Sequence, residues 1–245
     1  MRVDKMIGNA NLDTRRNIKR NAKKGALVIN GDIVKDTSTQ VDPNVDEVFY
    51  MGEFVEYFEN IYIMMNKPQG YISSTYDVDP TVVDILDDFY KTLDLSIAGR
   101  LDKDARGLLI LSTDGNFIHK ITSPNSNIEK TYEVETRDLI DESLVEEFLQ
   151  GVYIAEDNYQ ARPAKLKIID DKKAIVKVTE GKFHLVKRLF SNLGNEVVEL
   201  KRIAIGELRL DPFLNEGDYR ELNEKELALF TNWLNEGKEV ICIKI

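Results

Sequence analysis

The chain of 245 residues has one cysteine, two histidines and one tryptophan, and it has no long apolar run. Its single cysteine, Cys242, excludes an internal disulfide and a cysteine-based metal cluster. His119 and His184 lie in no recognised metal-ligand spacing, and no glycine-rich phosphate loop is visible, so a metalloenzyme is disfavoured. Apolar runs such as residues 108–111 are too short to span a bilayer, and no apolar signal-peptide core follows Met1. We therefore expect a cytoplasmic protein that does not bind a membrane.

Positive charge is concentrated at the start of the chain, although the whole chain carries a net charge of −10. Residues 1–35 contain nine Lys or Arg residues and three acidic residues, which gives this segment a net charge of +6. This asymmetry predicts a basic nucleic-acid contact module joined to a more acidic body, whereas the alternative is a basic helix that is merely solvated. The candidate RNA-binding residues are Arg2, Lys5, Arg15, Arg16, Lys19, Arg20, Lys23 and Lys24.

The same basic segment has the pattern of a compact helical unit followed by a hairpin. Thr14 is a candidate helix N-cap, and Gly25 would end a helix that covers residues 15–24. Asn30-Gly31 is a tight-turn dipeptide between two short apolar runs. Together these features resemble the RNA-binding domain first seen in ribosomal small-subunit protein four, so we call this segment the S4-like domain. The resemblance implies contact with structured RNA.

The rest of the chain mixes many strand patterns with a few helical ones, without regular alternation. Such a mixture predicts an α+β fold with a largely antiparallel sheet. We expect domains at residues 1–58 and 61–236 and a short extension at 237–245. The predicted strands include 48–51, 54–57, 108–111, 131–135, 165–169 and 174–178, with more in 197–210. The main predicted helices cover residues 81–89, 142–150, 182–193 and 224–235.

The most informative stretch, residues 99–115, reads G-R-L-D-K-D-A-R-G-L-L-I-L-S-T-D-G. It places Arg100 and Asp102 in a polar turn just before the apolar strand pattern 108–111. A carboxylate on an exposed turn anchored by a buried strand is well placed to attack a substrate, whereas the alternative is an ordinary turn in which the aspartate accepts a backbone N–H. The segment resembles the G-R-L-D signature of pseudouridine synthases, in which the aspartate is the catalytic residue.

A second stretch, E-G-K-F-H-L-V-K-R-L-F, predicts an amphipathic helix over residues 182–193. Apolar side chains, Phe183 among them, share one arc of this helix, and His184, Lys187 and Arg188 share the other. The alternative is a plain amphipathic helix with a solvated basic face. The pattern E-G-x-x-H-x-V-K-R-x-F resembles the corresponding helix of the small-subunit ribosomal RNA pseudouridine synthases, the RsuA type.

This resemblance covers nearly the whole chain and implies roles for individual residues. It implies that Asp102 is the catalytic carboxylate, that Lys187 supplies a nearby cation favouring the ionised carboxylate, and that Tyr132 stacks on the uracil. It also implies that Leu200 lines the uracil pocket and that Arg202 contacts RNA backbone. The substrate-binding residues expected in this way are Arg100, His184, Arg188, Leu200 and Arg202.

The function implied by the resemblance is isomerisation of one uridine in ribosomal RNA to pseudouridine, at uridine 516 of 16S rRNA. We expect a monomer that needs no metal and no cofactor and that acts on free or partly assembled 16S rRNA. Whether Asp102 attacks the sugar, attacks the base or removes a sugar proton stays open.

Two residues depart from the family pattern, because Ala105 stands where Thr is frequent and Leu185 stands where Gln is usual. One alternative function is therefore an RNA-binding or ribosome-assembly protein with an inactive synthase domain. Another is a hydrolase that cleaves an N-glycosidic bond with the carboxylates of Asp102 and Asp104.

Overall fold

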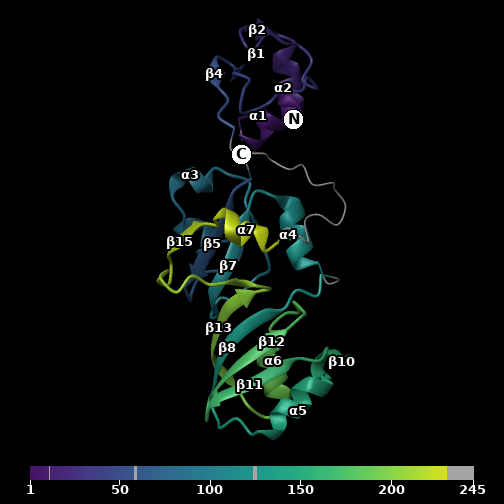
Figure 1. Cartoon of the computed structure of the whole chain (residues 1–245), viewed down its shortest axis with the longest axis vertical. Coiled ribbons are helices and arrows are strands. Elements are labelled where there is room, and N and C mark those ends of the chain that lie inside the picture. The colour runs from purple at the N-terminus through teal and green to yellow at the C-terminus, as the bar shows by residue number, and fades with distance from the viewer. Residues whose placement is uncertain (11, 58–59, 124–125, 231–245) are drawn as a thin grey trace. The chain divides into compact units, whose positions relative to one another are not determined.

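The computed structural model of the chain describes residues 1–10, 12–57, 60–123 and 126–230 (Figure 1). The chain forms two compact units, of which the first comprises Met1–Ile61 and Asp87–Leu95. The second unit comprises Tyr62–Leu86 and the described part of Ser96–Ile245. The expected extension at 237–245 lies outside the described residues.

The first unit packs helices α1 and α2 against a four-stranded antiparallel sheet of order β2-β1-β3-β4. The Thr14 hydroxyl accepts the N–H of Asn17 and begins α2, as the sequence predicts. Asn30 and Gly31 both have positive φ and form the turn between β1 and β2. The elements are α1 (Val3–Asn9), α2 (Arg15–Ala22), β1 (Leu27–Ile29), β2 (Asp32–Ile33), β3 (Val48–Tyr50) and β4 (Glu53–Phe54).

The second unit is built on a large mixed sheet, which confirms the predicted α+β class. Within the described residues nine strands form it, in the order β11-β12-β8-β13-β7-β5-β15, with β14 beside β13 and β6 beside β7 (Figure 1). Its pairings are antiparallel except the parallel one between β13 and β7. The strands of this sheet are β5 (Tyr62–Lys67), β6 (Ser96–Ile97), β7 (Arg106–Ser112), β8 (Lys130–Thr136), β11 (Lys165–Asp170), β12 (Lys173–Val178), β13 (Val197–Ile205), β14 (Leu208–Arg209) and β15 (Tyr219–Glu221). Two further strands, β9 (Tyr153–Ile154) and β10 (Tyr159–Gln160), form a separate hairpin.

The parallel pairing explains the glycine that follows the G-R-L-D segment. Gly107 lies opposite Arg202 in the register of β7 and β13, and its φ is +104°. A Cβ atom at this position would lie 2.2 Å from the Arg202 carbonyl oxygen. Only glycine lets the two backbones approach this closely. The turn that carries Asp102 is thereby fixed to the centre of the sheet.

Several helices differ from prediction, and the one predicted at 224–235 ends at Ala228. The predicted helix 81–89 is wrong, because a 3₁₀ turn (Val82–Ile85) and the short helix α3 (Asp88–Lys91) are separated by the extended Leu86. The helix predicted from residue 182 begins only at Leu185. The remaining helices are α4 (Gly115–Thr122), α5 (Ser143–Gln150), α6 (Leu185–Asn192) and α7 (Glu224–Ala228), with a second 3₁₀ turn at Ala155–Asp157. In the described ranges no helix is long and apolar enough to cross a membrane.

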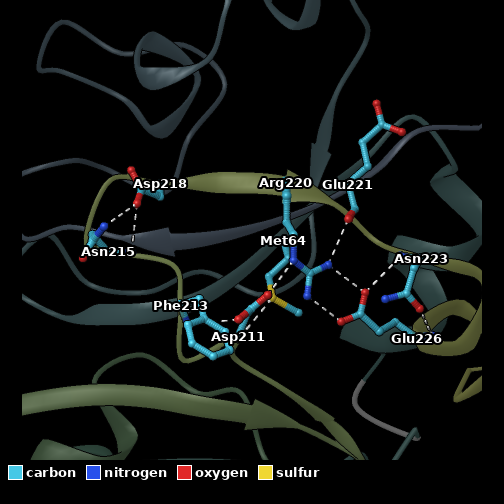
Figure 2. Close-up of polar contacts among 9 residues, drawn as sticks. All are labelled: Met64, Asp211, Phe213, Asn215, Asp218, Arg220, Glu221, Asn223 and Glu226. Atoms are coloured by element: carbon cyan, nitrogen blue, oxygen red, sulfur yellow. Dashed lines mark hydrogen bonds and ion pairs between the residues drawn. The ribbon is translucent and has the colours of Figure 1, made fainter.

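Arg220 joins the edge strand β15 to its neighbours (Figure 2). Its Nε donates to Asp211 at 2.8 Å, and its two terminal nitrogens donate to the carboxylate oxygens of Glu226 at 2.8 and 2.7 Å. Hydrogen bonding to Glu226, and then to Asp211, raises the pKa of the Arg220 guanidinium above its ordinary value. The Asp211 N–H in turn points to the sulfur of Met64 on β5. This network ties α7 and the segment that contains Asp211 to the edge strand β15.

Candidate active site

Asp102 lies in the connection between β6 and β7, which we call the aspartate loop (residues 99–105). Lys67, at the end of β5, holds the backbone of this loop from beneath. The Lys67 side chain is fully buried, and its ammonium donates to the carbonyl oxygens of Asp102 at 3.1 Å, Ala105 at 2.8 Å and Pro68 at 3.0 Å. A buried ammonium is costly unless such acceptors replace its water shell. Burial lowers the pKa of Lys67 to about 8, although the charge of Asp102 opposes the shift.

Two other buried side chains fix the same loop. The Ser73 hydroxyl donates to the Leu101 carbonyl at 2.8 Å and accepts the Leu101 N–H at 3.0 Å. Arg202 on β13 donates to the carbonyl of Gly99 at 3.0 Å and to that of Leu108 at 2.8 Å. The aspartate loop is thus held along its backbone by polar contacts, so the position of the Asp102 carboxylate is determined by the sheet beneath it.

The second wall of the site is the segment that leads into α6, which we call the histidine loop (residues 180–184). His184 Nε2 lies 3.3 Å from Asp102 Oδ1. His184 precedes the first residue of α6 and has a left-handed backbone with φ 51°. The conformation turns the chain sharply just before the helix, so His184 and Phe183 are not on the helix that the sequence predicts.

Lys187, on the first turn of α6, lies between two carboxylates. Its ammonium is 4.0 Å from Asp102 Oδ2 but only 2.6 Å from each oxygen of Asp104. Burial acts to raise the pKa of Asp104, but the hydrogen bond and charge of Lys187 outweigh it and the pKa lies below its ordinary value. Lys187 is therefore near Asp102, as predicted, while its closest partner is Asp104, which the sequence interpretation assigned only to a hydrolase alternative.

These residues surround a small cavity of about 90 Å³, which we call the inner cavity. Tyr132 on β8 and Leu200 and Arg202 on β13 share one face of the sheet and line the cavity together with Asp102 and His184. Arg100 lines it as well. The structure thus brings six of the predicted site residues to one place, namely Arg100, Asp102, Tyr132, His184, Leu200 and Arg202.

Two of the predicted substrate-binding residues have partners within the protein. Arg202 is only 2% exposed, and its guanidinium donates to the backbone of the aspartate loop. Arg188 donates to Asp157 at 2.7 Å and lies 3.8 Å from Glu156, on the side of α6 that packs against the β9–β10 hairpin. The pKa of the Arg188 guanidinium lies above its ordinary value, mainly because of the hydrogen bond to Asp157. Both arginines stabilise the protein around the site.

Sequence reasoning missed two buried lysines. Lys67 lies in the N-K-P-Q-G segment directly after an apolar run, and Lys130 begins the strand that carries Tyr132. Lys130 lines the inner cavity, and burial, followed by the charge of Arg202, lowers its pKa to about 8. For Lys67 the available signal was a charged residue at the end of an apolar strand, whereas the charged and polar strand that Lys130 begins gave no such signal.

The eight basic residues predicted to bind RNA all lie in the first unit, and all are exposed. Arg2 pairs with Asp4 at 2.6 Å, while Arg15, Arg16, Lys19 and Arg20 belong to α2. The buried side of α2 consists of Ile18 and Ala22, so its basic side chains lie on the solvent face. The exposure of these residues is compatible with an RNA-binding role.

Comparison with known proteins places the chain in a family. The sequence model of the RNA pseudouridylate synthase family matches residues 61–199. An RNA pseudouridine synthase of Bacillus subtilis, YtzG, described as uncharacterized, is 44% identical over 94% of this chain and 98% of its own length. Ribosomal small subunit pseudouridine synthase A of Haemophilus influenzae is 39% identical over 93% of this chain and 98% of its own length.

A solved structure agrees with these relatives. A crystal structure of a pseudouridylate synthase superposes with a TM-score of 0.66 at 38% identity, covering 93% of this chain and 98% of that chain. The chain therefore belongs to the RNA pseudouridylate synthase family, in its RsuA-type branch. It is an isomerase that acts on uridine in RNA.

Proposed function

We propose that the protein converts one uridine of small-subunit ribosomal RNA to pseudouridine, with Asp102 as the catalytic carboxylate. The observation that supports this most directly is the inner cavity, which is lined by Asp102, Tyr132, His184 and Leu200. The choice of RNA is supported by relatives named ribosomal small subunit pseudouridine synthase A in Haemophilus influenzae and Escherichia coli. The specific uridine that we propose is number 516 of 16S rRNA.

The reaction needs no oxidant and no cofactor. The N1–C1′ bond breaks, the uracil turns, and C5 bonds to C1′; C5 loses one proton and N1 gains one. Asp102 must be ionised whether it attacks the ribose, attacks the base or removes a ribose proton. The Lys187 ammonium lies 4.0 Å from Asp102 Oδ2. Tyr132 and Leu200 offer the uracil an aromatic face and an apolar wall.

The first unit is proposed to anchor the RNA as an S4-like domain covering residues 1–58. The target nucleotide must leave its stack, which costs on the order of a few kcal/mol. Contacts between the exposed basic side chains of α2 and RNA phosphates offset that cost. A monomeric state and a cytoplasmic location stay predictions.

The experiment is to incubate the full chain with a 16S rRNA transcript that carries tritium at C5 of uridine, and to map pseudouridine afterwards. We expect tritium release with one modified position, and loss of the same modification from cells that lack the protein. RNA binding without tritium release would instead support a ribosome-assembly protein with an inactive synthase domain. Free uracil among the products would support the hydrolase.

A further inference from the structure

A second hollow adjoins the inner cavity at its outer side. It has a volume of about 460 Å³ and shares Arg100, Asp102 and His184 with the inner cavity. Its own lining residues include Lys103 and Phe183. The volume lies within the usual range of about 300–1,000 Å³ for small-molecule sites, whereas the inner cavity is much smaller. The outer hollow is therefore large enough for a ligand group of its own.

Three cationic side chains line the outer hollow, namely Arg100, Lys103 and Lys182. Arg100 is exposed and makes no ion pair within the described ranges of the chain. The Lys103 ammonium pairs with Asp79 at 2.7 Å, and the Lys182 ammonium lies 3.1 Å from the centre of the Tyr159 ring. The cations form a positive rim around the hollow, which suits an anionic ligand.

Phe183 gives the same hollow an aromatic surface. Its ring stacks on that of His184, with centroids 3.6 Å apart and an angle of 21° between the planes. Phe183 is nevertheless 73% exposed, so the face turned away from His184 is open to solvent. The other partner of the His184 ring is Asp102, at 3.3 Å. The two stacked rings thus form a platform that begins at the catalytic carboxylate.

We propose that the outer hollow is a second nucleotide subsite, which binds the RNA nucleotide next to the uridine in the inner cavity. The base stacks on the open face of Phe183, and its phosphates lie beside Arg100, Lys103 and Lys182. Positive side chains around an exposed aromatic ring are the usual means of binding unstacked single-stranded nucleotides. The subsite rests on the proposed function, because the inner cavity must receive a uridine of the same RNA strand.

The test compares Phe183→Leu with Phe183→Tyr in the full chain, using the 16S rRNA transcript. Base–aromatic stacking predicts that Phe183→Leu weakens RNA binding by about 5- to 150-fold, while kcat stays within about twofold. Phe183→Tyr keeps the ring and should retain the affinity. Phe213→Leu is the matched control, because Phe213 is 89% exposed and lines neither hollow.

A second measurement identifies the stacked nucleotide directly. RNA oligonucleotides carry 2-aminopurine on the 5′ or the 3′ side of the target uridine, and stacking on an aromatic ring quenches its fluorescence. We expect quenching at one neighbour with the wild-type chain and its loss in Phe183→Leu. Unchanged affinity of Phe183→Leu, or a fall in kcat alone, would overturn the subsite. Absence of wild-type turnover would instead contradict the proposed function, so the two failures are distinguishable.

Discussion

The two loops that form the site are held in different ways. The aspartate loop is fixed through its backbone, because Lys67, Ser73 and Arg202 bind the peptide groups of residues 99–105 from buried positions. The histidine loop is fixed mainly through side chains, that of Glu180 at a nearly buried position and that of Lys182 at an exposed one. Glu180 accepts the hydroxyl proton of Tyr159, and Lys182 lies over the same ring.

The difference matches two separate tasks. A reacting carboxylate must be held in place, since a displacement of about 1 Å can cost about 100-fold in rate. A surface that binds RNA needs open aromatic and charged groups more than it needs rigidity. The comparison predicts that damage beneath the aspartate loop lowers kcat, whereas damage beneath the histidine loop raises KM.

Lys67→Met should have the largest effect. It removes the Lys67 donor from the carbonyls of Asp102 and Ala105, of which that of Asp102 still accepts the Ala105 N–H at 3.1 Å, so we expect a loss of about 1–3 kcal/mol in the free energy of unfolding. We also expect kcat to fall by at least about tenfold, because the Asp102 backbone loses its support. Urea unfolding and tritium release measure the two effects.

The control for this variant is Lys173→Met, because the Lys173 side chain is exposed and its ion pair with Glu135, at 3.7 Å, lies at the surface. Its loss should change stability by less than about 1 kcal/mol. If both variants had equally small effects, the aspartate loop would not depend on its buried lysine.

Tyr159→Phe tests the histidine loop. The change keeps the ring beneath Lys182 but removes the hydroxyl that donates to the nearly buried Glu180 carboxylate. We expect a loss of about 1–2 kcal/mol in stability and a severalfold higher KM with little change in kcat. Tyr153→Phe on the same hairpin removes an exposed hydroxyl bound to Asn158 and should change neither KM nor kcat. A fall in kcat without a change in KM in Tyr159→Phe would contradict the division of tasks.

The buried Lys130 makes a contribution to stability that has a defined pH dependence. Its pKa is about 8 in the folded protein and 10.5 without burial, so the unfolded chain binds the extra proton between these values. Stability therefore rises with pH from about 8 to 10.5, by up to about 1.4 kcal/mol per pH unit from this group. Lys130→Met has no buried ammonium, so we expect it to be more stable than the wild type at the lower end of this pH window. This difference in stability should shrink as the pH rises towards 10.5. A difference that stays constant between pH 8 and 10 would show that Lys130 is not desolvated.

Local signals predicted much of the fold. Thr14 begins α2 as expected, and Asn30-Gly31 turns between two strands as expected, because caps and tight turns depend on neighbouring residues. The start of α6 was placed too early, since apolar periodicity included Phe183 in the helical arc.

The site was predictable where a motif carried it and unpredictable where a long-range contact decides the role. The G-R-L-D segment led to Asp102, and the family resemblance led to Leu200, which lines the inner cavity as well. The hydrogen bond from Arg202 to the carbonyl of Gly99, 103 residues away, was not predictable, because nothing in the local sequence indicates it. The same holds for Lys67 and its acceptor at Asp102, 35 residues away.

The most direct test of the account compares Asp102→Asn with Asp104→Asn, two substitutions on the same turn. Both keep the side-chain shape and remove one negative charge, but only Asp102 lines the inner cavity. We predict that Asp102→Asn lowers tritium release from 16S rRNA by at least about 100-fold with RNA affinity nearly unchanged, while Asp104→Asn stays within about tenfold of the wild type. Turnover retained by Asp102→Asn would contradict the assignment of its carboxylate to the reaction.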